Sequence, residues 1–285
     1  MANTVVYKEE WKVKLQEKLD EAKYWDEICT ITYTERKTIN NPYQNVATAD
    51  SYTRGAQYTY NDWTVTNETL EIATTYVSPE FIDRADIAQT GYDMQMERAT
   101  RQAQILLDTL EAAAWAEYAN AGNTIDGVDI GEGAGDITVT ATNIDDIFRV
   151  ARTKIVEDKG LTELKNKGGF ALLDPARYEL LVAFAQANGF VFADDALVKG
   201  KVPVVNGFRV YETNLLTTET STTHLLFGVY GTIDLGILNT TFGDIMIDEN
   251  DPDNRSGISV VSRIDYGTKL FTEKVNMLVD VPVVA

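Results

Sequence analysis

Histidine and cysteine are almost absent from this sequence of 285 residues, which contains only His224 and Cys29. A structural zinc site needs four Cys or His ligands, and most nucleophilic catalysis relies on Cys or on a His acting as base. A single cysteine also excludes a disulfide within the chain. We therefore expect no enzymatic activity and no cofactor.

Basic charge is also scarce, with 25 Lys and Arg against 44 Asp and Glu, so the formal net charge is −19. The consecutive segments 1–77, 78–122, 123–200 and 201–285 carry net charges of −4, −5, −5 and −5. The acidity is thus spread over the whole surface, without a basic arm or an acidic tail. Such a surface excludes a protein whose main work is to hold phosphate backbones tightly.

Long apolar runs are missing too, since no stretch of about 18 apolar residues occurs and the N-terminus lacks the apolar core of a signal peptide. With 44% hydrophobic residues, however, the chain can bury a substantial core. The sequence therefore predicts a soluble, folded protein with no membrane partner.

An amphipathic helix is predicted over residues 8–28. Its apolar side chains recur at steps of three and four, with charged residues between them, and are Trp11, Leu15, Leu19, Ala22 and Trp25. This pattern indicates a helix that needs a partner surface, and we take Trp11, Leu15, Leu19 and Trp25 as candidate subunit-interface residues. The alternative is an ordinary surface helix of the same domain.

Residues 30–77 change to β character, rich in Thr and Tyr but poor in large aliphatic side chains. They predict a long hairpin that buries little on either face. Because an isolated two-stranded ribbon is marginal in water, we expect this hairpin to lie on another surface, such as a neighbouring subunit. Its candidate interface residues are Tyr52, Arg54, Tyr58 and Trp63.

A very long helix is predicted next, opened by Ser78 as cap and Pro79 at the first position and running from Glu80 to Ala121. About 40 helical residues span about 60 Å at 1.5 Å per residue. A compact chain of this length has a radius of gyration of about 19 Å. The helix would therefore span the whole body, unless Gly91 interrupts it.

The second half predicts alternating helices and strands. A helix capped by Thr142 or Asn143 and ending at Gly160 is followed by a strand over 170–173 and a helix over 174–187. A hairpin turns at Asn206-Gly207, and two long strands cover 258–264 and 268–281. Together with the first half, this order predicts an α+β fold with a projecting arm.

Three features of the sequence are candidate sites. As a catalytic base His224 would need a nucleophile and an orienting carboxylate, and no Gly-x-Ser-x-Gly motif is present, so a histidine at a strand edge or on the surface is expected. Cys29 is expected to be a buried structural thiol. The loop 248–257 offers oxygen ligands suited to calcium at Asp248, Asn250, Asp251 and Asp253. It lacks the EF-hand spacing, and a solvated loop is the alternative.

The order of these parts resembles the major capsid protein of tailed phages, the Hong Kong 97-like fold. An N-terminal arm, an extended β loop and a spine helix containing Leu106-Leu107-Asp108 and Leu110-Glu111 are similar to that family. Phe170 to Leu181 resembles the strand and helix of its axial domain, and Lys201 to Val210 resembles the segment that leads to its Gly-Phe-x-Val hairpin.

The resemblance implies a division of the chain. Residues 1–29 would be the N-terminal arm and 30–77 an extended loop that lies on an adjacent subunit. Residues 78–167 would form the peripheral domain with its spine helix, and 168–245 the axial domain at five-fold and six-fold centres. Residues 246–285 would be C-terminal strands that return to the peripheral domain.

The resemblance also implies a function and partners. Pentamers and hexamers would close into an icosahedral shell that encloses double-stranded DNA without binding it specifically. Scaffolding, portal and possible decoration proteins would be further partners, with assembly in the host cytoplasm and residence in the virion. Some relatives form a covalent cross-link through a loop lysine, but the loop here has only Lys37 near its base and Arg54 near its tip, which argues against such a bond.

Two other functions stay open. A cellular nanocompartment shell of the same fold, similar to encapsulins, would enclose a protein cargo. A carboxylate-based hydrolase or carbohydrate-binding protein would instead use the aromatic residues Tyr58, Tyr60 and Trp63, and these should then line a pocket in a stable monomer.

Overall fold

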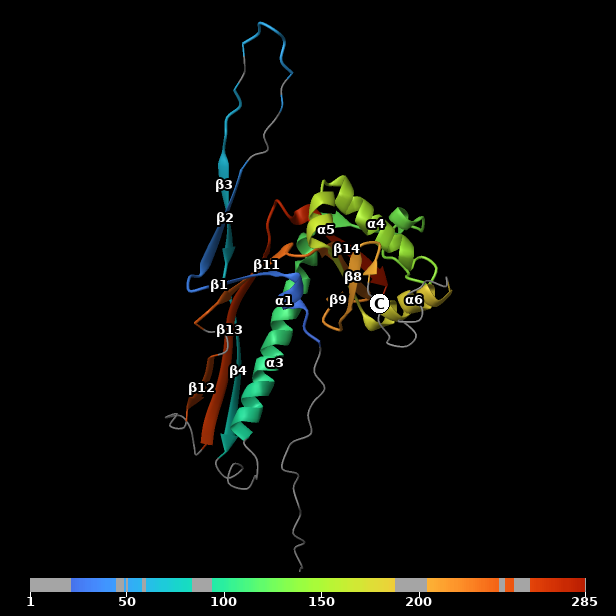
Figure 1. The fold of residues 1–285 in the computed structure, drawn as a ribbon. Coiled ribbons are helices and arrows are strands. Elements are labelled where there is room, and N and C mark those ends of the chain that lie inside the picture. Colours follow the sequence, from blue (N-terminus) through green and yellow to red (C-terminus); the bar gives the residue numbers. More distant parts are fainter. Residues whose placement is uncertain are drawn as a thin grey trace, which may run out of the picture.

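Two sheets with helices against them form two lobes, and a hairpin projects from one lobe (Figure 1). The computed structural model describes residues 22–44, 49, 51–57, 60–83, 94–187, 204–240, 244–248 and 257–284. Helices and strands are both abundant in the described residues, so the predicted α+β class is confirmed. None of the helices in this part of the chain combines the length and apolar character that a membrane span requires.

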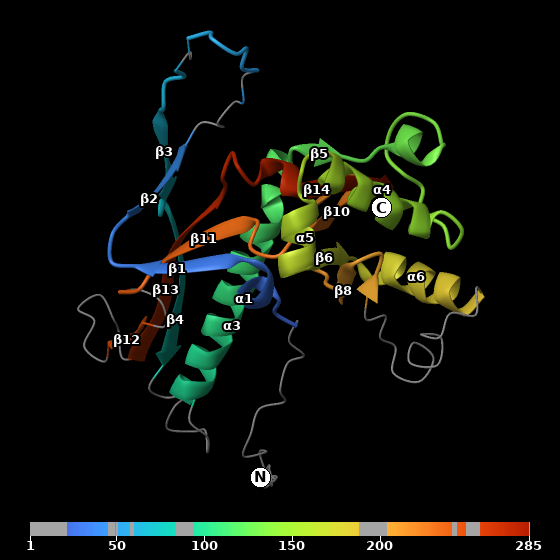
Figure 2. The same cartoon turned by 45° about the horizontal axis from the view of Figure 1, so that its top comes forward.

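The first lobe is a five-stranded sheet built around the long strand β13. Its strands are β1 (Thr30–Thr34), β4 (Thr74–Asp83), β11 (Ile233–Leu238), β12 (Asp244–Asp248) and β13 (Gly257–Leu270). β13 pairs antiparallel with β4, β11 and β12, and β1 joins as a parallel partner of β11. Helix α3 (Met94–Trp115) lies along one face of this sheet (Figures 1 and 2).

A buried polar contact locks α3 onto β13. The amide nitrogen of Gln102 donates to the carbonyl of Val260 over 3.1 Å, and Ser262 Oγ donates to the other end of the same amide over 2.8 Å. Around it pack Ile82, Ala99 and Ile258, all buried. Every polar atom of the Gln102 side chain thus finds a partner, as burial of an amide requires.

The second lobe is a seven-stranded mixed sheet with three helices. Its strands are β5 (Asn123–Thr124), β14 (Leu278–Val284), β10 (Thr222–Val229), β6 (Gly169–Leu173), β8 (Phe208–Glu212) and β7 (Val204–Val205), in that order, with β9 (Thr218–Glu219) paired to β10. The helices are α4 (Ile144–Glu157), α5 (Leu161–Lys167) and α6 (Pro175–Ala187). Short 3₁₀ turns are η1 (Ala116–Asn120), η2 (Gly127–Ile130) and η3 (Val275–Met277).

The core of this lobe is aromatic. Phe148 of α4 meets Phe227 of β10 edge to face with ring centroids 4.9 Å apart, and Phe208 of β8 meets the same Phe227 at 5.7 Å. The helix over 142–160 was predicted from a single apolar face, and all five residues of that face are buried: Ile144, Ile147, Phe148, Ala151 and Ile155. Helical periodicity therefore predicted this packing correctly.

The projecting arm is a two-stranded ribbon of β2 (Thr38–Gln44) and β3 (Val65–Glu71), paired from Thr38 opposite Glu71 to Gln44 opposite Val65. Figure 1 shows it extending well away from both lobes. The predicted hairpin over 30–77 is thus confirmed for its central part, while β1 and the start of β4 leave it and join the five-stranded sheet.

The predicted helix start at Ser78-Pro79 is wrong. Residues 78–83 belong to β4, which pairs with β13 from Thr74 opposite Tyr266 to Asp83 opposite Gly257. β4 is an edge strand, where the missing N–H of a proline is tolerated, so the local cap signal was outweighed by long-range pairing. The described helix α3 has 22 residues, which span about 33 Å rather than 60 Å, and Gly91 lies outside the described residues.

The strand predicted over 268–281 is also wrong, because β13 ends at Leu270 and the η3 turn separates it from β14. β12 and β13 lie in the first lobe, and β14 pairs with β10 in the second lobe. Helices α4 and α5 pack on the second lobe, and β11 pairs with β13 in the first. Strand partners far apart in sequence decide these assignments.

The helix predicted over 8–28 is confirmed only for Trp25–Ile28, because residues 22–24 are not helical and residues 8–21 lie outside the described residues. Two other local predictions are confirmed. β6 and α6 follow one another as predicted, and the hairpin of β7 and β8 turns at Asn206-Gly207. Both turn residues have positive φ, 51° and 95°, which is the requirement of the two-residue turn that Asn-Gly favours.

Close approach of two backbones at Gly267 gives a test of the fold. A Cβ there would lie 2.1 Å from the carbonyl oxygen of Glu71, so the strands must separate. We expect Gly267→Ala to lower the unfolding free energy by about 2 kcal/mol or more. Gly133 is the matched control, because a Cβ there meets nothing within 4 Å. Gly133→Ala should change the unfolding free energy by less than about 0.5 kcal/mol. Equal midpoints in urea for the two variants would contradict this packing.

Candidate assembly surfaces and polar sites

The arm exposes large aromatic side chains beyond its paired strands. Tyr60 is 89% exposed, Trp63 is 70% exposed, and Tyr52 is more than half exposed. Arg54 is exposed in the turn at the tip, where Ala56 N–H donates to the carbonyl of Thr53 over 2.9 Å. Tyr58, also a candidate, lies outside the described residues. The described candidates Tyr52, Arg54 and Trp63 are therefore all exposed within the arm.

The candidates of the N-terminal segment separate into two groups. Trp11, Leu15 and Leu19 lie outside the described residues. Trp25 belongs to α1 (Trp25–Ile28) and is only 7% exposed, packed in the main core cluster of its own chain. Within the subunit, Trp25 therefore anchors the end of the N-terminal segment rather than presenting a free surface.

A second apolar surface was not found from the sequence. On the five-stranded sheet, Val260 and Ser262 face α3, so their alternating neighbours face the other way. On that opposite side Pro79 and Met246 both pair with Val261, and Phe81 and Val77 lie along the same strand as Pro79. Val77, Pro79, Phe81 and Met246 are exposed, Met246 by 63%. We call Val77, Pro79, Phe81, Val261 and Met246 the outer sheet face.

Sequence reasoning missed the outer sheet face because it placed residues 78–83 in a helix. The alternation that would have revealed it is the period of two in Val77, Pro79 and Phe81.

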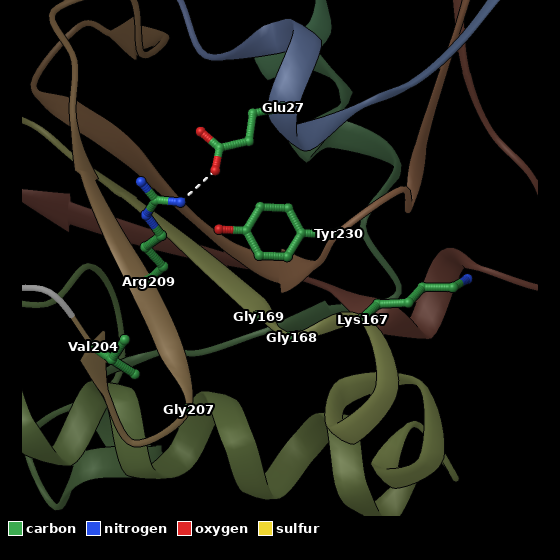
Figure 3. A pocket seen from close by; sticks show the side chains of 8 residues that line it. All are labelled: Glu27, Lys167, Gly168, Gly169, Val204, Gly207, Arg209 and Tyr230. Carbon is green, nitrogen blue, oxygen red and sulfur yellow. Dashed lines mark hydrogen bonds and ion pairs between the residues drawn. The ribbon is translucent and has the colours of Figure 1, made fainter.

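An open pocket of about 420 Å³ lies where α1 meets the second lobe (Figure 3). Arg209 Nη1 of β8 and Glu27 Oε1 of α1 form an ion pair of 2.5 Å across its mouth, and Lys167 stands at the opposite side. The hydroxyls of Tyr211 and Tyr230 are 2.6 Å apart behind it, and burial raises the pKa of both. Neither Tyr60 nor Trp63 lines this pocket, contrary to the expectation of a carbohydrate site.

His224 is placed differently from the prediction of a strand-edge or surface residue. It lies on β10 opposite Pro282 of β14, its backbone N–H donates to the carbonyl of Thr217, and its ring is stacked on Tyr118 at 3.9 Å between centroids. Its Nδ1 is 3.0 Å from Asp280 Oδ1, and burial raises the pKa of Asp280 to about 6 although His224 opposes this. Tyr118 in turn donates to Glu219 Oε1 over 2.7 Å. The described partners of His224 are thus a carboxylate and a phenol ring that fix it inside the sheet.

The two other predicted sites are Cys29 and the loop 248–257. Cys29 is buried, as predicted, and burial raises the pKa of its thiol, which makes it a structural residue of low reactivity. Of the possible ion ligands, Asn250, Asp251 and Asp253 lie outside the described residues, and Asp248 is the last residue of β12. Within the described ranges, no group of three His, Cys, Asp or Glu is arranged to hold a metal ion.

Comparisons with known proteins give a consistent result. A family model for phage capsid proteins matches residues 64–276. A chain from Mycobacterium phage Che8 has the same fold at a TM-score of 0.76 and 14% identity, covering 98% of this chain and 98% of that chain. The capsid structure of cyanophage P-SCSP1u has a TM-score of 0.72 and 17% identity, covering 95% of this chain and 91% of that chain. The capsid of a native GTA particle has a TM-score of 0.71 and 10% identity, covering 98% of this chain and 96% of that chain. No curated protein matches the sequence.

Trp25 and Trp63 were both predicted as interface residues, but replacing them by alanine should change the stability of the unassembled chain by different amounts. Trp25→Ala removes a buried side chain, and we expect the unfolding free energy to fall by about 3 to 5 kcal/mol. Trp63→Ala removes an exposed side chain and should change the unfolding free energy by less than about 0.5 kcal/mol. Urea denaturation of both variants checks this, and a similar loss for both would mean that the arm packs on its own subunit.

Proposed function

The chain belongs to the phage capsid protein family as a major capsid protein of the head shell, and we propose that its copies assemble as pentamers and hexamers into an icosahedral shell around double-stranded DNA. The Hong Kong 97-like fold predicted from the sequence is the fold of this chain. Membership of a structural capsid family agrees with the expectation of a protein without enzymatic activity and makes the chain a component of the virion.

The projecting arm is the observation that carries the assembly proposal. A two-stranded ribbon is marginal by itself in water, yet this arm projects away from both lobes (Figure 2). It exposes Tyr52, Tyr60 and Trp63. Exposed apolar patches of this kind mark protein contacts. We therefore assign the arm to contacts with a neighbouring copy, and the outer sheet face of that copy supplies apolar side chains to receive it.

Repetition explains how such contacts hold a shell together. In a closed shell each subunit both gives an arm and receives one, so the loss of one contact leaves the subunit held by the others. Once one contact has formed, the remaining contacts of the same subunit form at a high effective concentration. The combined affinity therefore exceeds that of any single interface. The aromatic residues of the arm need only modest affinity for this purpose. The N-terminal residues Trp11, Leu15 and Leu19 remain further interface candidates.

The two lobes support an assignment of the family's domains. We assign the five-stranded sheet and α3 to the peripheral domain, and the seven-stranded sheet with α4, α5 and α6 to the axial domain that meets at five-fold and six-fold centres. β14 and the segment from η2 to α5 then belong with the axial lobe. Supporting this, the strands pair within two separate sheets, β1, β4, β11, β12 and β13 in the first and β5 to β10 with β14 in the second.

Charge supports the proposal that the enclosed DNA is not bound specifically. A net charge of −19, spread over all parts of the chain, repels a phosphate backbone at long range. DNA can then be packed at high density without adhering to the wall. Scaffolding, portal and decoration proteins are the partners that we propose for assembly in the host cytoplasm.

Electron microscopy of the purified protein tests the central proposal. We expect uniform shells or capsomers, because the arm and the outer sheet face need neighbouring copies. A chain that stays monomeric at high concentration, with and without scaffolding protein from the same phage, would disprove it. Nucleic acid in shells recovered from infected cells separates a phage head from a nanocompartment, whose shells would hold protein.

Removal of the N-terminal segment tests its part in assembly. Because Trp25 and Ile28 are core residues, the deletion must stop before them, and we expect a chain lacking residues 2–21 to fold but to assemble poorly. The combined variant Tyr60→Ala and Trp63→Ala should show the same separation between folding and assembly. Thermal unfolding and sedimentation velocity measure the two properties, and normal shells from either variant would contradict the role given to that segment.

A further inference from the structure

The segment Lys23–Cys29, which contains α1, contacts both lobes and is held partly by a buried carboxylate. We propose that this segment, here called the clasp, is a pH-responsive device that couples the N-terminal arm to the junction of the two lobes, with Glu111 of α3 as the responding group. The proposal goes beyond shell formation, since it concerns a conformational equilibrium within one subunit.

The contacts of the clasp with the first lobe are made to α3. Lys23 Nζ forms an ion pair with Asp108, and the backbone N–H of Tyr24 donates to Glu111 Oε1 over 3.2 Å. One turn further along, Trp25 and Ile28 are buried in the core. Asp108 and Glu111 lie three residues apart on α3, so they face the clasp from the same side of the helix.

The same short segment also contacts the second lobe. The ring of Tyr24 packs on Tyr211 with centroids 4.9 Å apart, and Glu27 pairs with Arg209 at 2.5 Å (Figure 3). The N–H of Gly231 donates to the carbonyl of Ile28 over 2.8 Å, at the crossing from β10 to β11. Release of the clasp from α3 would therefore loosen a connection between the lobes as well as the end of the N-terminal segment.

Glu111 is the unusual member of this set. Its side chain is 0% exposed, and Oε2 is buried without a hydrogen-bond partner, as is Nε1 of Trp115 on the next turn of the helix. The titratable and charged groups that act around it are Lys23 and Cys29 of the clasp and Asp108 of its own helix. A carboxylate in this position is poorly compensated, because it has one clear hydrogen bond and one cation nearby.

The direction of the response follows from this environment. Burial raises the pKa of Glu111 from 4.5 to about 7, although the Tyr24 N–H, Lys23 and the nearby indole of Trp115 oppose this. When the clasp opens, water reaches the carboxyl group and its pKa returns towards 4.5. The closed state therefore binds the proton more tightly. Its extra stability is complete below pH 4.5 and is lost as the pH rises through about 7. The clasp is tight in acid, loosens as the pH rises towards 7, and has lost this extra stability above neutrality.

Hydrogen exchange of the unassembled full chain tests this inference independently of shell formation. The reporters are the amides of Ile28 and Cys29, which donate to the carbonyls of Tyr24 and Trp25 over 3.0 and 2.9 Å. After correction for intrinsic exchange rates, we expect their protection to fall by about tenfold between pH 5.5 and pH 8.5. The amides of β6, all in the buried core, should keep their protection over the same range.

Glu111→Gln is the decisive variant, because its amide oxygen can still accept from Tyr24 but cannot titrate. We expect clasp protection independent of pH and close to that of the wild type at pH 5.5. Glu157→Gln on the exposed side of α4 is the matched control and should respond to pH as the wild type does. Should Glu111→Gln fail to fold, Glu111→Met serves the same purpose. A flat pH profile in the wild type, or an unchanged pH response after loss of the Glu111 carboxyl group, would overturn the inference.

Discussion

The backbone pairing of β13 is the constraint on which the rest of the structure depends. This strand of 14 residues pairs with β4 over its first ten residues, with β12 along the other edge and with β11 at its end, while Gln102 of α3 is hydrogen bonded to its main chain. β4 leads directly from the arm, so the same pairing fixes where the arm leaves the body. β11 leads back to the second lobe through Gly231, so the pairing also sets the junction that the clasp crosses.

A subunit built in this way presents surfaces rather than a reactive centre. Three side chains whose pKa is raised by burial are internal: Asp280 contacts His224, Glu111 contacts the clasp, and Cys29 is buried. Among the described residues, exposed large apolar side chains occur on the arm, at Tyr52, Tyr60 and Trp63, and on the outer sheet face, at Val77, Phe81 and Met246, while others such as Ile105 and Val128 lie singly elsewhere. For a protein of the head shell this division is physically reasonable, because assembly needs many modest contacts while DNA must be enclosed without being held.

Local signals predicted those elements whose stability is local. The apolar face of α4, the succession of β6 and α6 and the Asn206-Gly207 turn each depend on residues a few positions apart, and all were predicted correctly. Ser78-Pro79-Glu80 has an equally good local signal for a helix, but ten backbone pairs with β13 outweigh one cap. Trp25 and His224 were misplaced for a related reason, since the residues that bury them lie far away in the sequence.

The sequence by itself determined the class of protein: its acidity, its single histidine and cysteine, its β-rich arm and its alternation of helices and strands exclude most catalysts and agree with the shell fold. Only the tertiary structure decided which strands share a sheet, that α3 is shorter than predicted in the described residues, and that Glu111 meets the clasp. The physical reason is distance along the chain. Burial and strand pairing are set by partners 85 to 200 residues apart, such as Lys23 with Asp108 and Lys269 with the carbonyl of Thr69, and no local pattern specifies them.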